Sequence, residues 1–253
     1  MPVQICEGLS KRALRGFKNK LHGIFSMLGI LFSGGKDSVF TTYYYLEQGW
    51  EVKCLISMRS KNPSSWMFHT PAAELTSVQS EAMGIPIIVR ETEGEKEKEL
   101  EDLKAALLEA KKKYGLRAVA VGALLSDYQH ERVNRICHIL GLKCFAPLWH
   151  KEQEKLLREI ISLGFDVRLV GIASQGLDGS FLGKKIEKEM VEKFAALHKK
   201  YGFHVGGEGG EYESLVVDGP IFKKRIELAQ TRSVMSGENT GQLEIIDSRL
   251  ADK

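Results

Sequence analysis

The feature that most constrains this sequence is an apolar run that stops at two glycines and is followed directly by a helix-compatible segment. The run covers residues 27–32, the glycines are Gly34 and Gly35, and Lys36-Asp37-Ser38 comes next. This order predicts a buried strand, a short turn and a helix. Glycines let such a turn adopt positive φ and approach a ligand closely. Because the free N–H groups of a first helical turn attract anions, we expect a phosphate-binding cradle here.

The side chains of this segment suit pyrophosphate. Ser33 and Ser38 supply hydroxyl groups, Lys36 adds a mobile positive charge, and Asp37 can orient the loop or help to hold a Mg²⁺ ion that a polyphosphate brings. An ordinary strand-to-helix turn is the simpler alternative. A Walker-type loop needs a longer spacer between its glycines and ends in Lys-Ser or Lys-Thr, which this segment lacks. Residues 33–38 instead resemble the PP-loop of the ATP pyrophosphatase superfamily, which implies AMP and pyrophosphate as products.

Composition excludes several classes of protein. The chain has 253 residues and is 43% hydrophobic, which is enough for a full core in one large or two small domains. Its net charge of +3 is mixed along the chain, so we expect no direct nucleic-acid partner. The four cysteines form no C-x-x-C pair, which favours a reducing, cytoplasmic setting. No stretch approaches ~20 apolar residues, so we expect no membrane span.

Strands and helices alternate after the cradle. The spacing predicts helices over residues 38–48, 70–84 and 94–114, and strands over 51–58, 85–89 and 117–124, the strand at 85–89 being covered on both faces. This rhythm predicts an α/β fold with a doubly wound parallel sheet, and the PP-loop resemblance implies the HUP (adenine nucleotide α-hydrolase-like) type. Ligands bind such sheets outside the carboxyl ends of the strands. We therefore expect His69 and Gly122 beside the cradle, and backbone groups of Ile56 to Met58 against adenine.

The chain is expected to have three parts. Residues 1–23 are basic and are predicted to be an extension: a targeting-like segment, an appended helix, or the result of a start codon placed too early. Residues 24–130 are predicted to be the ATP-binding domain, and residues 131–253 a smaller α+β substrate domain. From residue 128 onward we expect helices over 128–140, 151–163 and 182–200, with strands over 143–146 and 167–172.

A second signature lies near the carboxyl end. Two glycine pairs bracket Glu208 in residues 206–214, just before the apolar strand 215–217. A two-residue hairpin turn needs only one such pair, so we expect backbone donors and the carboxylates of Glu208, Glu211 and Glu213 to share a pocket. A glycine-rich loop with solvated acids is the alternative. Elsewhere Ser126 and Gln129 match a capping box, a role that does not require Asp127, Tyr128 or Arg132.

These motifs together resemble the diphthine–ammonia ligase family from Met27 to the end of the chain. They are the PP-loop, Met67-Phe68-His69-Thr70, Gly122 with Ser126-Asp127-Tyr128-Gln129 and Arg132, Pro147-Leu148-Trp149, Gly176-Leu177 with Leu182-Gly183, and residues 208–214. The resemblance implies adenylation of the carboxylate of diphthine on a translation elongation factor, followed by displacement of AMP by ammonium to give diphthamide. It implies ATP and Mg²⁺ as cofactors and leaves a homo-oligomer open. Lys184 stands where the family usually has Arg, and Ala123 where many members have an acid.

The resemblance and the residues give the following site. Catalysis is assigned to Lys36, Asp37, Glu208 and Glu211, with Asp37 as the metal ligand. ATP is assigned to Ser33, Gly34, Gly35, Lys36, Asp37, Ser38, Ile56, Met58, His69 and Gly122. The acceptor is assigned to Ser126, Asp127, Tyr128, Gln129, Arg132, Glu208, Gly209, Gly210, Glu211, Tyr212, Glu213 and Ser214. We expect Tyr212 and Trp149 to offer aromatic faces to the trimethylammonium group of diphthine.

Two other functions compete with this one. One is a PP-loop enzyme that modifies tRNA by thiolation or by a lysidine-type base modification. Thiolation would use a persulfide cysteine and often C-x-x-C zinc sites, neither of which the sequence provides. A nucleotide-binding regulator of the universal-stress type would bind ATP without turnover. Such a regulator has no use for the paired acids Glu208 and Glu211.

Overall fold

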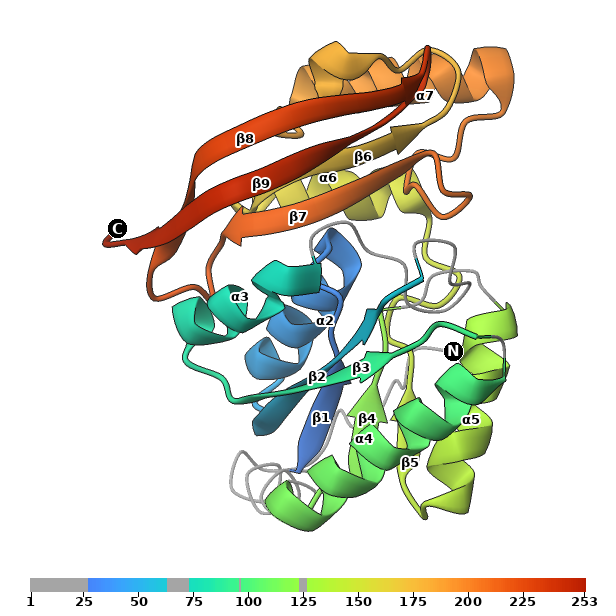
Figure 1. The fold of residues 1–253 in the computed structure, drawn as a ribbon, viewed down its shortest axis with the longest axis vertical. Coiled ribbons are helices and arrows are strands. Elements are labelled where there is room, and N and C mark those ends of the chain that lie inside the picture. The colour runs from blue at the N-terminus through green and yellow to red at the C-terminus, as the bar shows by residue number, and fades with distance from the viewer. Residues whose placement is uncertain (1–26, 63–72, 96, 123–126) are drawn as a thin grey trace, which may run out of the picture.

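The computed structural model describes residues 27–62, 73–95, 97–122 and 127–253, which form two sheets with helices packed around them (Figure 1). The extension predicted for residues 1–23 lies outside these ranges. None of the helices within them combines the length and the apolar character needed to cross a bilayer.

The first sheet is parallel and has five strands in the order β3-β2-β1-β4-β5. Its strands are β1 (Leu28–Leu31), β2 (Val52–Ser60), β3 (Ile87–Thr92), β4 (Ala118–Ala120) and β5 (Lys143–Phe145). The helices are α2 (Lys36–Glu47), α3 (Thr76–Met83) after the short turn η1 (Ala73–Leu75), α4 (Lys98–Tyr114) and α5 (Asp127–Ile139). The predicted α/β fold with a parallel sheet is confirmed.

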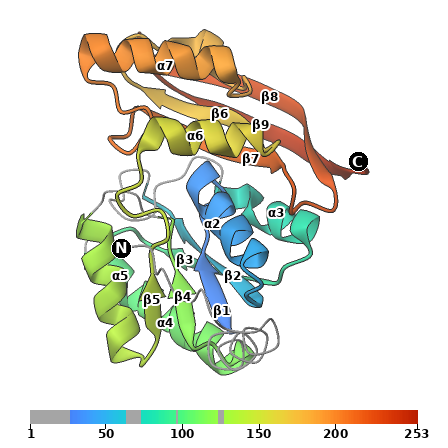
Figure 2. The same cartoon turned by 180° about the vertical axis from the view of Figure 1, so that it is seen from behind.

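Apolar side chains cover this sheet on both faces. On β2, Cys54 and Ile56 pack in one cluster with α4 and α5, whereas Leu55 packs in the other cluster, to which α2 belongs. Side chains alternate along a strand, so a strand with two apolar sets must be covered twice. Figures 1 and 2 show α4 and α5 on one face and α2 on the other. Because β1 is central, the turn after it lies at the middle of the sheet's carboxyl edge.

Two details of the first sheet were predicted wrongly. β3 is an edge strand in which Val89 is 36% exposed, so it is not covered on both faces. α4 begins at Lys98 rather than at residue 94. Periodicity identifies the apolar run at 85–89 but not its place in the sheet, since strand order depends on contacts with distant residues.

The second sheet is antiparallel, with four strands in the order β7-β6-β9-β8. Its strands are β6 (Asp166–Ala173), β7 (Tyr212–Asp218), β8 (Arg225–Gly237) and β9 (Thr240–Ala251), and its helices are α6 (Gln153–Ser162) and α7 (Lys188–Tyr201), with the short turn η2 (Gly179–Phe181). This is the predicted carboxyl-terminal α+β part. The strand–helix rhythm of the first sheet runs unbroken into β6, because a strand buried on both faces looks alike in either kind of sheet.

The helix predicted over 182–200 begins six residues later, at Lys188. The reason is that the preceding segment adds to the edge of β6. The Gly183 N–H donates to the Leu169 carbonyl at 2.8 Å, and the Ile186 N–H donates to the Val167 carbonyl at 2.7 Å. These bonds fix an extended backbone that helical spacing alone does not reveal.

The domain boundary predicted between residues 130 and 131 lies inside α5. α5 packs on β5, and β5 pairs with β4 in the first sheet, whereas α6 packs against α7. On this arrangement we propose a division between β5 and α6.

Candidate active site

The turn between β1 and α2 closes on itself through short polar contacts. The Ser38 hydroxyl donates to the Gly35 carbonyl at 3.0 Å, and the Ser33 N–H donates to Ser38 Oγ at 3.3 Å. Gly34 has a φ of 82°, a conformation that favours glycine. The turn therefore places the start of α2 at the carboxyl edge of the sheet, where a phosphate cradle is predicted.

Lys36 lies inside this cradle and is held in place, so the prediction of a mobile charge is wrong. Its side chain is 5% exposed, and Nζ lies 2.8 Å from Asp37 Oδ2 and donates to the Gly206 carbonyl at 2.5 Å. Burial opposes the charged form, but acidic neighbours, Asp37 first, outweigh it and raise the Lys36 pKa. The ammonium group is thus charged and pre-positioned, which is what stabilisation of a developing anion requires.

The two signatures meet at this point. The Lys36 N–H donates to Ser214 Oγ at 3.2 Å across 178 positions of sequence, and the Val216 N–H donates to the Gly34 carbonyl at 3.1 Å. Together with the bond from Lys36 to Gly206, these contacts join the edge of β7 to the cradle. The segments at 33–38 and 206–214 therefore form one site at the junction of the two sheets.

The acids of the second signature have different surroundings. Both Glu211 oxygens accept backbone bonds, from the His204 N–H at 3.0 Å and the Gly209 N–H at 2.9 Å. The Glu208 N–H donates to His204 Nδ1 at 3.1 Å, and burial lowers the His204 pKa, so the ring accepts as a neutral imidazole. Glu211 therefore braces the loop that carries Glu208.

Glu213 is an acid of this signature with a perturbed pKa. Burial raises the pKa of Glu213 to about 7, against an opposing effect of Lys36 and with the help of Asp37 and Glu208. These charges act on Glu213 because its carboxyl lies near the cradle. A carboxyl that titrates near neutrality is suited to proton transfer.

Tyr212 is part of the support for Lys36. It is 3% exposed, its hydroxyl donates to the Val205 carbonyl at 2.9 Å, and its ring stacks on Phe194 at 5.0 Å between centroids. Lys36 Nζ lies 5.3 Å from the centre of the same ring. This packing assigns Tyr212 to the floor of the cradle rather than to an acceptor. Trp149, its expected partner, stacks on His130 at 4.4 Å in the connection between the sheets.

The pairing of β2, the strand beside the cradle, limits which of its backbone groups can contact adenine. Pairing between β1 and β2 ends at Leu31 opposite Ile56, and the Phe32 N–H donates to the Ile56 carbonyl at 2.8 Å. β2 continues to Ser60, paired with β3 on its other side. Because the Ile56 carbonyl is already engaged, Met58 is the better candidate for a backbone contact with the base.

Gly122 abuts the start of α2. A Cβ at this position would lie 2.8 Å from the Asp37 carbonyl carbon and 2.9 Å from the Ser38 nitrogen, both of them backbone atoms that cannot turn aside. Its place beside the cradle is therefore explained by close packing as well as by the expected contact with ATP.

A Gly122→Ala substitution is expected to displace the first turn of α2. Overpacking of this kind costs about 1–3 kcal/mol, and we expect a comparable loss in the free energy of unfolding together with slower turnover. Chemical denaturation and a turnover assay measure the two effects. Gly237→Ala is the matched control, because its Cβ would meet nothing closer than 3.8 Å. Equal behaviour of the two variants would contradict the packing argument.

Several predicted residues are not placed by the structure. His69 and Ser126 lie outside the described residues, as do the side chains of Asp127, Tyr128 and Gln129 in the first turn of α5. Arg132 is described, and its Nη2 lies 3.3 Å from Glu97 Oε1, just before the start of α4. The assignment of His69 to ATP, and of the other five residues to the acceptor, stays a prediction.

The donor set fits a metal ion that arrives with its phosphates. Asp37 Oδ2 is bonded to Lys36, while Asp37 Oδ1 is buried without a hydrogen-bond partner among the described residues. The same part of the chain holds no group of three or more His, Cys, Asp or Glu that could bind a metal. Mg²⁺ commonly takes one or two carboxylates and completes its shell with phosphate oxygens and water.

Sequence reasoning missed Gln79, Gln153 and His204. Gln79 is fully buried and bonds to Gly34, and Gln153 Oε1 accepts from the Gly206 N–H at 3.1 Å. One signal existed: Gln79 falls on the stripe 76, 79, 80 and 83, all buried, at the spacing of an inward helical face. A glutamine at such a position needs partners for its amide.

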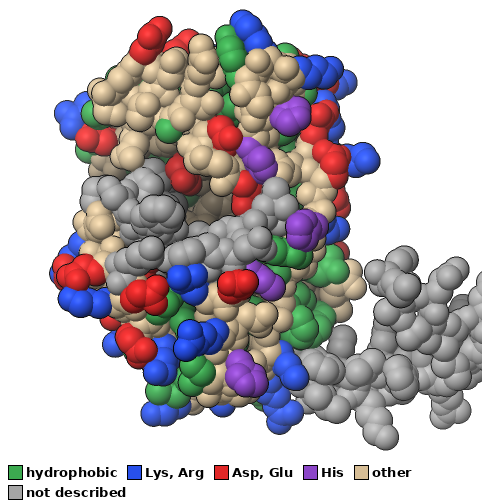
Figure 3. All heavy atoms as spheres, turned by 90° about the vertical axis from the view of Figure 1, so that its right-hand side faces the viewer, with side chains coloured by type: hydrophobic (Ala, Val, Ile, Leu, Met, Phe, Trp, Pro, Cys, Tyr) green, Lys and Arg blue, Asp and Glu red, His purple; other side chains and the backbone are tan. Residues whose placement is uncertain are grey.

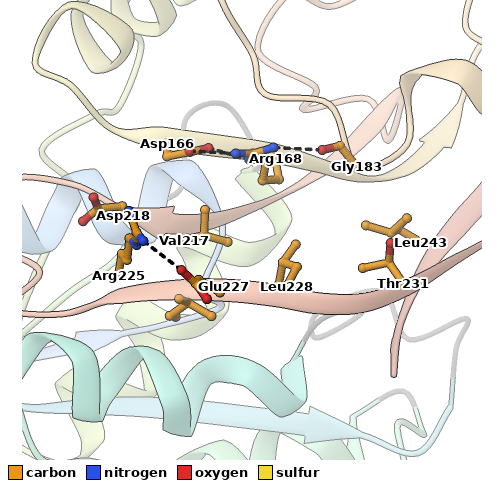
Figure 4. Close-up of a pocket in the computed structure, with 11 residues that line it drawn as sticks. Asp166, Arg168, Gly183, Val217, Asp218, Arg225, Glu227, Leu228, Thr231 and Leu243 are labelled. Atoms are coloured by element: carbon orange, nitrogen blue, oxygen red, sulfur yellow. Dashed lines mark hydrogen bonds and ion pairs between the residues drawn. The ribbon is translucent and has the colours of Figure 1, made fainter. Parts of the chain in front are cut away.

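The side of the molecule is hollowed between the two sheets, with acidic side chains on its rim (Figure 3). A second hollow, of about 590 Å³, lies on the second sheet between β6 and β8 (Figure 4). Its charged groups are paired: Arg168 with Asp166, Arg225 with Glu227, and Asp218 with Lys253. None of the predicted site residues lines this second hollow, so we assign no catalytic role to it.

Comparison with known proteins covers most of the described chain. Residues 27–144 match the family model described as the diphthamide synthase N-terminal domain, and residues 152–248 match the diphthamide synthase C-terminal domain. The mouse protein named diphthine–ammonia ligase is 37% identical over 81% of this chain and 84% of its own length. The human protein of that name is 34% identical over 88% of this chain and 92% of its own length. A fission yeast relative is 36% identical over 84% of this chain but only 38% of its own length.

Among solved structures, one described as a predicted subunit of a tRNA methyltransferase from Methanocaldococcus jannaschii resembles this chain. It is 17% identical, covers 76% of this chain and 97% of its own, and has a TM-score of 0.40.

Proposed function

Because this chain belongs to the diphthamide synthase family, we propose that ATP and the acceptor carboxylate meet where the cradle joins the segment 206–214. The activity follows from the family: the chain is a carbon–nitrogen ligase that uses ATP to amidate diphthine to diphthamide. The observation that supports our assignment of the site is the position of Lys36. Its backbone bonds to Ser214 and its ammonium group to Gly206, so one residue connects both signatures.

The proposed reaction has two steps. An oxygen of the diphthine carboxylate attacks the α-phosphorus of ATP, and the bond to the β,γ-pyrophosphate breaks. Lys36 and the N–H groups of the cradle stabilise the charge that grows on the departing pyrophosphate. Ammonia then attacks the acyl carbon, AMP leaves with the former carboxylate oxygen, and Glu213 takes the proton released by the nitrogen.

Asp37 is the residue that we propose to hold Mg²⁺, through its unpartnered Oδ1. When bound, the ion would neutralise phosphate charge. Met58 is proposed to contact adenine. The proposed partners are ammonia and the elongation factor that carries diphthine. The free thiols of Cys54, Cys137 and Cys144 fit the reducing conditions of the cytoplasm, where we place the reaction.

The competing functions lack such support. Thiolation of tRNA would need a reactive thiolate, a role for which Cys54 is unsuited, because burial raises its pKa to about 12. A regulator without turnover would not need the near-neutral carboxyl of Glu213 beside the cradle.

With purified protein, ATP and elongation factor bearing diphthine, ammonium salts are expected to support formation of AMP, pyrophosphate and diphthamide in equal amounts. Glutamine alone is not expected to replace ammonium, since a glutaminase step needs its own activated nucleophile and pocket. Chromatography of nucleotides and mass spectrometry of the factor measure both expectations. ADP as the product, or turnover driven by glutamine, would contradict this proposal.

A further inference from the structure

Gln79 of α3 connects the cradle to β7 through hydrogen bonds of its side chain. Its side chain is fully buried, and Nε2 donates to the Gly34 carbonyl at 2.9 Å and to the Val216 carbonyl at 2.7 Å. The same Gly34 carbonyl also accepts from the Val216 N–H at 3.1 Å. One carbonyl of the cradle is therefore held by two donors on the side of α3 and β7.

Fixing this carbonyl also fixes the next N–H group. In a trans peptide the C=O of Gly34 and the N–H of Gly35 belong to one plane and point in opposite directions. With the carbonyl held toward Gln79, the Gly35 N–H points to the other side, where it donates to Ser33 Oγ at 3.4 Å. This is the side on which we expect the cradle to receive an anion.

The peptide between two glycines is the one in this turn that can rotate most easily, because neither residue has a Cβ to restrict it. Rotation would turn a carbonyl oxygen toward the bound anion and remove a donor. A Cβ at Gly34 would also collide with Gln79 Oε1, so side chain and glycine fit each other closely.

The amide of Gln79 is not explained by packing alone. Its Oε1 is buried and has no hydrogen-bond partner among the described residues, which is a cost that a leucine of similar size would avoid. The side chain therefore retains a polar group at this position for the sake of its two donor bonds.

We propose that Gln79 is a positioning residue that locks the Gly34–Gly35 peptide with its N–H toward the pyrophosphate group. The inference rests on the proposed function of the cradle. It predicts that loss of Gln79 selectively weakens contacts to pyrophosphate, the part of ATP that departs, and leaves contacts to AMP unchanged.

The test compares binding of inorganic pyrophosphate and of AMP, each with Mg²⁺, by calorimetry. Gln79→Leu is expected to weaken pyrophosphate binding roughly tenfold, below the 10²–10³-fold cost of deleting an oxyanion donor, and to change AMP binding less than about twofold. Ser80→Ala is the matched control, because Ser80 Oγ donates to the Ile85 carbonyl at 2.6 Å in the same helix without touching the cradle. It should lower the melting temperature and leave both affinities unchanged.

Gln79→Glu keeps the result decisive if the leucine variant does not fold. A protonated carboxyl can still donate to one of the two carbonyls, whereas an ionised one repels both. Relative to the unsubstituted protein, this variant should bind pyrophosphate progressively less well as pH rises from 6 to 9. Equal weakening of AMP binding and pyrophosphate binding in Gln79→Leu would overturn the inference. So would a pyrophosphate affinity of Gln79→Glu, relative to the unsubstituted protein, that does not change with pH. Binding is measured without turnover, so a failure to form AMP in the full reaction would count against the proposed function alone.

Discussion

A Lys36→Met variant is expected to form AMP and pyrophosphate at about one-hundredth of the normal rate or less, the usual cost of removing a donor that stabilises developing charge. The ammonium group is charged and fixed before the reaction, by Asp37 and by the Gly206 carbonyl. Such a group is most effective when the pyrophosphate separates. ATP affinity is therefore expected to fall much less than the turnover rate.

Single-turnover kinetics together with calorimetric ATP binding measure the two quantities separately. Lys104→Met is the matched control, since Lys104 is a half-buried lysine of α4, away from the cradle, paired with Glu101 at 3.1 Å. An unchanged rate for Lys36→Met, or a loss of ATP affinity as large as the loss of rate, would contradict the role given to Lys36.

A Glu213→Gln variant is expected to form the adenylate and then stall. Removal of a general base typically costs 10²–10⁴-fold, and here the loss should fall on the amidation step, which releases a proton. Only the ionised carboxyl can accept that proton, and its pKa is raised by burial to about 7. The ratio of normal to variant amidation rates should therefore rise with pH and level off above about 7, with the pH dependence of ammonia itself cancelling in the ratio.

The free energy of unfolding should change with pH in the opposite sense to the amidation rate. The Glu213 pKa is raised on folding from 4.5 to about 7, so ionisation disfavours the native state across that interval. Relative to the Gln variant, the normal protein should lose stability as pH rises through this window and stay less stable above it, by on the order of 3 kcal/mol. Glu227→Gln is the control, because Arg249 and Arg225 lower the Glu227 pKa. Rate and stability ratios that do not vary with pH would rule out Glu213 as the base.

The strand–glycine–helix unit was predictable because its signals are local. Residues 27–38 contain an apolar run, two glycines and the start of a helix. The structure forms β1 and the beginning of α2 from these residues. Alternation of strands and helices likewise predicts the first sheet, since parallel pairing requires crossover helices. The edge position of β3 was not predictable, because it depends on which strands lie beside it.

The site was predictable in its members but not in their contacts. Residues 33–38 and 206–214 each stand out locally, yet the bond from Lys36 to Ser214 spans the chain. The other properties of the site depend on burial, which sequence patterns do not show. Lys36 and Tyr212 are buried beside each other, and burial raises the Glu213 pKa. Gln79 has no motif around it, and only its inward position in α3 marks it.

The central claim is that this junction transfers AMP to a carboxylate before nitrogen enters. Isotope transfer tests it most directly: elongation factor carrying diphthine labelled with ¹⁸O in its carboxylate is converted with ATP and ammonium, and the nucleotide product is analysed by mass spectrometry. The account predicts that one labelled oxygen appears in AMP, because the oxygen that attacked the α-phosphorus leaves with it. Label in inorganic phosphate with ADP as the product, or AMP without label, would contradict it.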